Sequence, residues 1–216
     1  MNRGQAAPPA AREGRILLIR HGQTAWNGQR YAGWEDIPLD QIGRRHSREI
    51  AGRLAQERID RIYSSPLRRA VDTIRPLAEK RGLEVRTADD LRELHYGDWQ
   101  GSLKSDHDLR VKEHHQFLPL PGGESLFSVY QRVKRFTEGL AMLRSGAHLA
   151  IVGHFWSNRM LLGAIRRLPF RDILGQSDYM PRNGSVLDIS YVVSSGQEVQ
   201  AVRCTGLTES GNGIVP

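Results

Sequence analysis

Cysteine, lysine and long apolar runs are scarce in this sequence of 216 residues. Cys204 is the only cysteine, which excludes a disulfide scaffold and a cysteine-based zinc site, and which fits a reducing compartment such as the cytoplasm. No apolar run approaches the ~20 residues that span a bilayer, so no membrane partner is expected. Residues 1–14 lack the apolar core of a signal peptide, and we expect them to form a short disordered tail.

Arginine supplies most of the positive charge. The chain has 27 Arg and 4 Lys, a net charge of +7 and a pI of about 10.0. Such a balance is compatible with nucleic acid, an anionic membrane or small acidic molecules as partners. The arginines are scattered and no aromatic residues alternate with them, which favours a dispersed basic surface over a nucleic-acid interface. Since the planar guanidinium suits phosphate oxygens, the composition favours a small anionic ligand.

Short apolar runs alternate with helical patterns along the chain. Strands are predicted at residues 15–20, 59–63, 83–87 and 147–153, and a terminal hairpin at 185–193 and 198–203 around a turn at 194–197. Helices are predicted at residues 40–56, 67–80 and 156–166. Ile42, Ile50 and Leu54 share one face of the first helix, and Pro76 should kink or restart the second. The order indicates an α/β fold with a mostly parallel sheet covered on both faces.

The clearest helix lies between the last two parallel strands. Its apolar residues are spaced by alternating threes and fours, as in an amphipathic helix: Leu126, Val129, Val133, Phe136, Leu140 and Leu143. We therefore expect one domain at residues 15–216, with a short polar cap around 102–120. The sequence leaves the oligomeric state open, with a homodimer as one candidate.

Polar residues follow three of the predicted strands. Arg20, His21 and Gly22 end the first strand, Arg69 comes shortly after the second, and His154 directly follows the strand at 147–153. Ligands of parallel sheets bind beyond the carboxyl ends of the strands, so we expect these residues on one edge. A lone histidine after a strand is usually an ordinary loop residue, but three such placements together indicate a site.

Two histidines and two arginines together suit phosphoryl transfer. A neutral imidazole is nucleophilic near pH 7, and guanidinium groups stabilise the charge that spreads over the phosphoryl oxygens. Gly22 would let a phosphate approach the backbone. The leaving oxygen needs a proton, and Glu93, after the third strand, is the candidate acid on the same edge.

These residues also carry a resemblance to a known family. LIRHGQTAWN at 18–27 resembles the signature of the histidine phosphatase superfamily, which includes the phosphoglycerate mutases. SSPLRRAVDT at 64–73 resembles the second motif, whose phosphate-binding arginine precedes the alanine and therefore maps to Arg69, not Arg68. LRELHYGDWQG at 91–101 is similar to the block with the acid/base glutamate, here Glu93, while PGGES at 121–125 and VGH at 152–154 are further matches.

The resemblance implies a three-layer α/β/α sandwich and a set of roles. His21 would become a phosphohistidine, and Glu93 would protonate the leaving oxygen and then activate water. Arg20, Arg69 and His154 would bind the phosphoryl oxygens, with the Asn27 amide as a further donor. Gly22 and Thr24, within the first motif, would complete the substrate-binding set. No metal or other cofactor is implied, because the cationic side chains would carry the electrostatic role of a metal.

Two further features bear on the reaction. Phe155 and Trp156 follow the second histidine, where the family often has small residues, and they could line the pocket or pack inward. Only nineteen residues, 102–120, separate Gly101 from Pro121, whereas relatives resembling the mutases carry a long insertion there. A short cap leaves the site open to water and favours hydrolysis of a small phosphomonoester. A phosphoglycerate mutase-type transfer and a non-catalytic phosphate-binding or regulatory module are the alternatives.

The polar cap offers two weaker signals. Its acidic and histidine residues are metal-ligand types, but their spacing fits a solvated loop better: Asp106, His107, Asp108, His114 and His115. Lys112, His114 or His115 could instead reach an anionic substrate. The turn at 122–125 opens the amphipathic helix and could bind an anion there or simply cap the helix.

Overall fold

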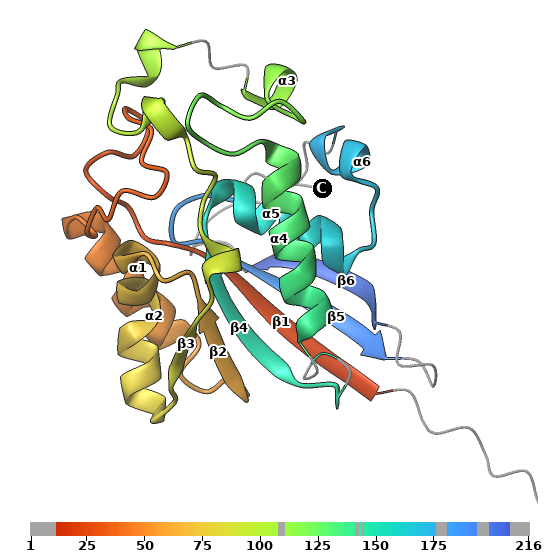
Figure 1. Cartoon of the computed structure of the whole chain (residues 1–216). Coiled ribbons are helices and arrows are strands. Elements are labelled where there is room, and N and C mark those ends of the chain that lie inside the picture. Colours follow the sequence, from red (N-terminus) through yellow and green to blue (C-terminus); the bar gives the residue numbers. More distant parts are fainter. Residues whose placement is uncertain are drawn as a thin grey trace, which may run out of the picture.

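Six strands form one mixed sheet in the order β3-β2-β4-β1-β5-β6 (Figure 1). The computed structural model describes residues 12–107, 111–140, 143, 145–175, 181–193 and 199–207. The strands are β1 Arg12–Arg20, β2 Arg61–Ser64, β3 Val85–Thr87, β4 His148–Gly153, β5 Val186–Val193 and β6 Val199–Leu207. β1, β4, β2 and β3 pair in parallel, whereas β5 is antiparallel to both β1 and β6. The mostly parallel sheet and the terminal hairpin are thus confirmed, while the turn predicted at 194–197 lies outside the described residues.

Helices cover both faces of this sheet (Figure 1). They are α1 Gln41–Arg53, α2 Arg68–Arg81, α3 Val111–His114, α4 Leu126–Gly139, α5 Phe155–Ile165 and α6 Phe170–Gly175. On β1, Leu17 and Ile19 join the core formed with α1 and α2, whereas Ile16 and Leu18 join the core formed with α4, α5 and α6. This alternation buries both faces of a central strand. The three-layer α/β/α arrangement is therefore confirmed.

The apolar periodicities locate the helices well, with one exception. All six residues of the stripe from Leu126 to Leu143 are buried, but α4 ends at Gly139, so Leu140 and Leu143 lie beyond the helix. In α1, Ile50 and Leu54 are buried as predicted, but Ile42 is 40% exposed, so the prediction for Ile42 was wrong. The buried face begins one residue later, at Gly43, because the backbone of Gly43 packs directly against that of Gln23. A Cβ added to Gly43 would lie 2.0 Å from the carbonyl oxygen of Gln23. Close backbone packing, not an apolar side chain, thus starts the buried face of α1.

Pro76 lies within α2, which continues unbroken to Arg81, so the predicted restart of the helix was wrong. A proline has no N–H for the carbonyl four residues earlier, here that of Asp72. The hydroxyl of Ser47 on α1 lies 2.9 Å from that carbonyl oxygen, to which it donates a hydrogen bond, and 3.0 Å from the carbonyl oxygen of Thr73. A side chain of the neighbouring helix therefore replaces the bond that proline removes.

The structure describes only part of the expected N-terminal tail and of the expected cap. β1 begins at Arg12, so residues 12–14, expected in the tail, belong to the sheet, while residues 1–11 lie outside the described residues. The cap contains a 3₁₀ turn, Lys104–Asp106, and the short helix α3, and it lies above the ends of the parallel strands in Figure 1. Residues 108–110 of the cap, with Asp108, are not described.

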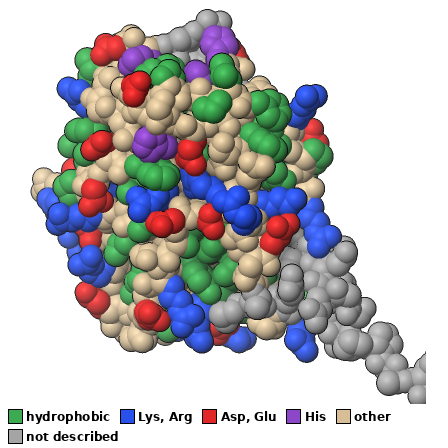
Figure 2. All heavy atoms as spheres, viewed as in Figure 1, with side chains coloured by type: hydrophobic (Ala, Val, Ile, Leu, Met, Phe, Trp, Pro, Cys, Tyr) green, Lys and Arg blue, Asp and Glu red, His purple; other side chains and the backbone are tan. Residues whose placement is uncertain are grey.

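The face drawn in Figure 2 agrees with the dispersed charge expected from the sequence. On the face shown in Figure 2, Lys and Arg side chains lie among Asp and Glu side chains. Across the described part of the chain, no helix combines the length and apolar character needed to cross a membrane.

Candidate active site

The carboxyl ends of β1, β4 and β2 meet at one edge of the sheet, and the expected residues gather there. Arg20 is the last residue of β1, Arg69 lies in the first turn of α2, and His154 is the N-cap residue of α5. A cavity of about 570 Å³ opens at this edge. Its lining includes Arg20, His21, Thr24, Asn27, Arg69 and Glu93. The tertiary structure thus joins segments that the sequence keeps far apart.

His21, which lines this cavity, lies beside His154, which is fully buried and is not part of the lining. Their ring centroids are 4.9 Å apart and the rings are tilted by 53°. Nδ1 of His21 is 2.7 Å from the carbonyl oxygen of Gly22. Since a carbonyl only accepts, Nδ1 carries the hydrogen of the neutral ring, and Nε2 keeps the lone pair. His21 therefore has the tautomer that a nucleophile attacking through Nε2 requires.

Burial and positive neighbours keep both rings neutral. The pKa of His21 lies well below its usual 6.5, first because the ring is buried and second because Arg69 and Arg20 disfavour a further positive charge. Burial and Arg69 lower the pKa of His154 in the same way. Among the described residues, neither ring nitrogen of His154 has a hydrogen-bond partner, although both are buried. A buried ring with unused polar atoms beside His21 is suited to contact an anion held there.

Arg69 is held rigidly at the floor of the cavity. Its two terminal nitrogens donate to the carbonyl oxygens of Glu35 and Gly33, each at 2.7 Å. Burial lowers its pKa to about 10, which still leaves the guanidinium charged at neutral pH. Arg20 donates to the carbonyl oxygen of Pro181 at 2.5 Å, and its guanidinium lies 5.4 Å from the centre of the Phe155 ring. Two permanent positive charges therefore flank His21.

Glu93 lies at the N-terminus of α5, next to the histidine pair. Its Oε1 accepts from the N–H groups of Leu94 and Trp156, at 2.9 and 3.0 Å, and its Oε2 accepts from Phe155 N–H at 2.9 Å. Behind it, Arg132 donates to the Glu93 carbonyl oxygen at 2.8 Å. Three backbone donors thus fix the carboxylate in one orientation at the wall of the cavity.

Arg132 in turn pairs with Glu124 of the PGGES segment, whose role the sequence left open. The Nε of Arg132 lies 2.9 Å from Glu124 Oε1, and Glu124 Oε2 accepts from His95 N–H at 3.0 Å. Ser125 caps α4, with its Oγ accepting from Ser128 N–H at 3.1 Å. The turn at 122–125 therefore braces the Glu93 segment and caps a helix, which is the plainer of its two interpretations.

Of the remaining residues predicted to bind substrate, two line the cavity and one does not. Thr24 and Asn27 line the cavity, and Asn27 Oδ1 accepts from the N–H and the hydroxyl of Thr24 at 2.8 and 2.9 Å. Gly22 is not part of the lining. A Cβ there would lie 2.7 Å from the carbonyl oxygen of Gly43 in α1. Close packing against α1 therefore requires glycine at this position.

Phe155 and Trp156 were expected either to line the pocket or to pack inward, and the structure shows elements of both. Both line the cavity, yet Trp156 is also buried in the core beside α4. Its indole N–H donates to the Tyr96 hydroxyl at 3.2 Å. Arg20 and Arg159 lie 5.4 and 5.8 Å from the Phe155 ring, a cation–π geometry. The two aromatic residues shape the wall and also hold charged neighbours.

Several lining residues escaped the sequence analysis. Asn183 reaches the cavity from the loop before β5, and a cap residue, Lys104, lines it from above. Aromatic and basic side chains complete the outer wall: Trp26, Arg30, Tyr31 and Tyr96. Tyr96 stands in the motif around Glu93 and could have been noticed there. Asn183 had no such signal, because only tertiary contacts bring it to His21.

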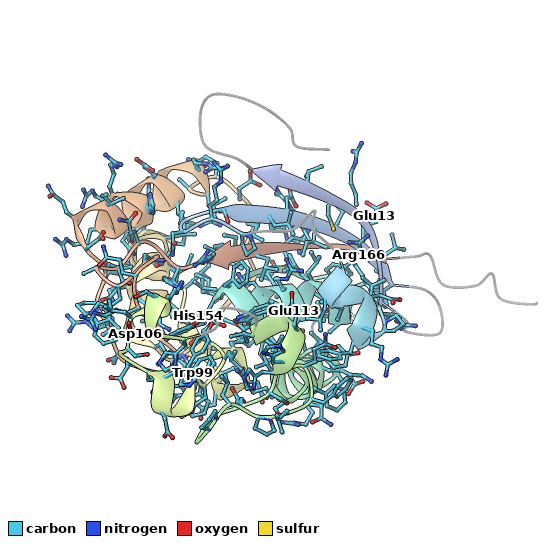
Figure 3. The ribbon with its side chains drawn as sticks, turned by 90° about the horizontal axis from the view of Figure 1, so that it is seen from above. Glu13, Trp99, Asp106, Glu113, His154 and Arg166 are labelled. Carbon is cyan, nitrogen blue, oxygen red and sulfur yellow. The ribbon has the colours of Figure 1, made fainter. Side chains whose placement is uncertain are left out.

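The cap histidines do not form a metal site among the described residues, which contain no group of three or more His, Cys, Asp or Glu able to hold an ion. His107 instead stacks on Trp99, with ring centroids 4.4 Å apart. His114 and His115 are not in the cavity lining, and the Lys112 side chain lies outside the described residues. Viewed from above in Figure 3, Trp99 and the cap residue Asp106 lie on the same side of the molecule as His154, whereas Glu13 and Arg166 lie toward the other side.

Comparisons with known proteins agree with this geometry. Phosphoserine phosphatase 1 of Hydrogenobacter thermophilus is 37% identical over 149 residues, which are 65% of this chain and 70% of the relative. Phosphoglycerate mutase-like protein 4 of Arabidopsis thaliana is 36% identical over 150 residues, 64% of this chain and 65% of the relative. The matched segment thus spans about two thirds of these curated relatives.

The likeness extends to solved structures. The native structure of mycobacterial glucosyl-3-phosphoglycerate phosphatase has a TM-score of 0.75 and 30% identity to this chain, covering 94% of this chain and 100% of that one. The sequence of residues 16–200 matches the histidine phosphatase superfamily (branch 1), and the chain belongs to that family.

Proposed function

We propose that this chain is a metal-independent phosphatase that hydrolyses a small phosphomonoester through a phosphohistidine on His21. One observation carries the proposal. A neutral His21, whose Nδ1–H is committed to the Gly22 carbonyl, presents its Nε2 lone pair beside the permanent charges of Arg20 and Arg69. Such an arrangement attracts a phosphate and attacks it without needing a proton removed first.

The first half-reaction transfers the phosphoryl group to the protein. Nε2 of His21 attacks phosphorus in line with the leaving oxygen, and the bond between phosphorus and that oxygen breaks. Arg20, Arg69 and the His154 ring contact the phosphoryl oxygens, whose charge rises in the transition state. A proton on the Glu93 carboxyl passes to the leaving oxygen, so that an alcohol departs.

The second half-reaction returns the phosphohistidine to the starting state. The Glu93 carboxylate takes a proton from water, whose oxygen attacks phosphorus as the bond to Nε2 breaks. The products are orthophosphate, the neutral His21 and a protonated Glu93. Arg20 and Arg69 supply the positive charge that metal ions supply in other phosphoryl-transfer enzymes, and the same contacts serve both steps.

The outer wall indicates what kind of leaving group the site accepts. Arg30 and Lys104 add positive charge there, and burial together with Arg20 lowers the pKa of Lys104. Trp26 and Tyr31 offer aromatic surface. A small, polar phosphomonoester such as a sugar or glycerate phosphate fits this mixed wall. The relatives named phosphoserine phosphatase and glucosyl-3-phosphoglycerate phosphatase support that substrate class.

Phosphoglycerate mutase-type transfer is the second candidate, favoured by the relative named as mutase-like. Both reactions share the phosphohistidine and differ in the acceptor, which is water or a second substrate oxygen. The nineteen residues between Gly101 and Pro121 make a short cap, which supports hydrolysis because a mutase must exclude water.

The test is phosphate release from a chromogenic phosphate ester in the presence of EDTA. We expect release by the wild type and none by His21→Ala, with Arg182→Ala, an exposed residue outside the cavity, as the matched control. Equal release by wild type and His21→Ala would remove the proposal. Incubation with 3-phosphoglycerate and catalytic bisphosphoglycerate separates the mutase, which yields the 2-isomer faster than free phosphate.

The cellular location is a proposal as well. The single cysteine, Cys204, is exposed, which supports a reducing location. We therefore place the protein in the cytoplasm, which fractionation of cells checks.

The third candidate function is a non-catalytic binding module. Such a module would bind vanadate or nucleic acid without turnover. Vanadate affinity that disappears in Arg69→Ala, together with turnover by the wild type, supports the enzyme instead.

A further inference from the structure

The loop at 181–184 is fastened to the strand that carries the nucleophile. The Gly184 N–H lies 3.1 Å from the carbonyl oxygens of both Arg20 and His21. Gly184 has a φ of 77°, and the ring of His46 on α1 packs against it so closely that a Cβ would lie 2.8 Å from the ring. The position of this loop relative to His21 is therefore closely defined, and Asn183 is the residue that it presents to the cavity.

Both the nitrogen and the oxygen of the Asn183 side-chain amide make hydrogen bonds. Its Nδ2 donates to the main-chain carbonyl oxygen of His21 at 3.1 Å. Its Oδ1 accepts a hydrogen bond from Nδ2 of Asn27 at 2.7 Å. Asn183 thus bridges the nucleophile's backbone and a residue expected to contact the phosphoryl group.

The bridge determines where the Asn27 amide points. Asn27 Oδ1 is already turned toward Thr24, from which it accepts two hydrogen bonds. One hydrogen of Asn27 Nδ2 goes to Asn183, and the geometry of an amide leaves the second hydrogen for another acceptor. Asn27 lines the cavity, so this hydrogen is available to an oxygen of a bound phosphoryl group.

We propose that Asn183 is a positioning residue, which aims the Asn27 amide at the phosphoryl group and fixes its distance from His21. The inference rests on the proposed phosphatase function and adds to it a residue that acts through Asn27. An amide is the side chain of this size that can donate to the His21 carbonyl and accept from Asn27 at once. Aspartate would present acceptors only, and its charge would repel an anionic substrate.

A double-mutant cycle tests whether Asn183 acts through Asn27. The variants are Asn183→Ala, Asn27→Ala and the combination of the two, assayed for kcat/KM with a chromogenic phosphate ester and for vanadate affinity by calorimetry. We expect Asn183→Ala to lower both quantities about 2- to 15-fold, as loss of one net hydrogen bond does. We expect Asn183→Ala to have no further effect when Asn27 is already alanine.

The controls separate positioning from loss of the fold. Arg182→Ala lies in the same loop with an exposed side chain and should retain wild-type values. Thermal unfolding is followed for every variant, and Asn183→Ser replaces Asn183→Ala if the latter does not fold. A merely structural role would lower activity equally in both Asn27 backgrounds.

Three results are distinguishable. Wild-type turnover with non-additive losses supports the bridge. Wild-type turnover with multiplicative losses, or with no loss in Asn183→Ala, overturns it while leaving the phosphatase intact. Absence of wild-type turnover removes the proposed function itself. In that case, non-additive changes of vanadate affinity in the same cycle would still support the bridge as part of an anion site. Additive changes of vanadate affinity would overturn the bridge.

Discussion

The imidazole rings of His21 and His154 lie side by side, with centroids 4.9 Å apart, and burial lowers the pKa of both. Arg69 and Arg20 act in the same direction on each ring. The two neutral rings thus lie close to two charged guanidinium groups. A phosphate that enters the cavity meets no proton on Nε2 of His21. This relationship has a consequence for stability as well as for catalysis.

The first prediction concerns the pH dependence of unfolding. The folded chain keeps both rings neutral, whereas the unfolded chain protonates them near pH 6.5. The stability that the neutral rings contribute is therefore complete above pH 6.5 and is lost as the pH falls toward their folded pKa values. We expect the free energy of unfolding in urea to fall by up to about 1.4 kcal/mol per pH unit for each ring below pH 6.5.

The comparison for this prediction is the variant His21→Asn/His154→Asn, which should show a shallower decrease over the same range. Equal slopes in the wild type and the double variant would contradict the assignment of neutral rings. Because unfolding is measured without substrate, titration of the phosphate ester does not interfere.

The second prediction concerns Glu93. Glu93→Gln keeps the shape of the side chain but cannot give a proton to the leaving oxygen. We expect kcat/KM for an alkyl phosphate to fall about 10²- to 10⁴-fold, the usual contribution of a general acid, and to fall much less for p-nitrophenyl phosphate, whose leaving group departs without a proton. Glu79→Gln, exposed on α2, is the matched control. An equal loss for both esters would mean that Glu93 acts otherwise than as the acid.

The third prediction concerns Phe155, whose ring lies 5.4 Å from the Arg20 guanidinium. Removal of the ring should loosen Arg20 and weaken its hold on an anion. We expect Phe155→Leu to weaken vanadate binding about 2- to 30-fold, the range of cation–π energies from exposed to desolvated sites. Phe155→Tyr keeps the ring and should bind nearly as the wild type does. Calorimetry that finds the same affinity for both variants would exclude this role.

The fourth prediction concerns Ser47 and Pro76. Ser47→Ala leaves the Asp72 carbonyl without the donor that replaces the missing N–H of Pro76. We expect a loss of about 1 kcal/mol in the free energy of unfolding, as for one lost hydrogen bond at a partly buried acceptor. In a Pro76→Ala background the helix supplies its own N–H, so the same serine change should cost clearly less. Unfolding in urea of the four chains measures the coupling, and additive losses would disprove it.

The local pattern of the sequence was enough to predict most elements and the edge at which the site lies. Residues 15–20 form a continuous apolar run, as a strand buried on both faces requires, and the stripe from Leu126 to Leu143 has the spacing of a helix buried on one face. His21 and His154 directly follow strands, so the parallel order alone brings them to one edge. The location of Arg69 and Glu93 beside them follows from the same order.

Contacts between distant segments decided the rest. Pro76 remains inside a helix because Ser47 lies on the neighbouring helix, and Ile42 is exposed because the close approach of Gly43 to Gln23 sets the orientation of α1. The loop at 181–184 brings Asn183 to His21 from the other end of the chain.

The amino-acid sequence by itself therefore determined the layered fold and the edge at which His21, His154 and their charged neighbours gather, since these depend on the apolar pattern and on the residues that follow each strand. The tertiary structure alone decided the tautomer of His21, the neutrality of the two rings and the orientation of the Asn27 amide. The physical reason is that burial and hydrogen bonds, which set proton positions and side-chain directions, arise only where separate segments pack together.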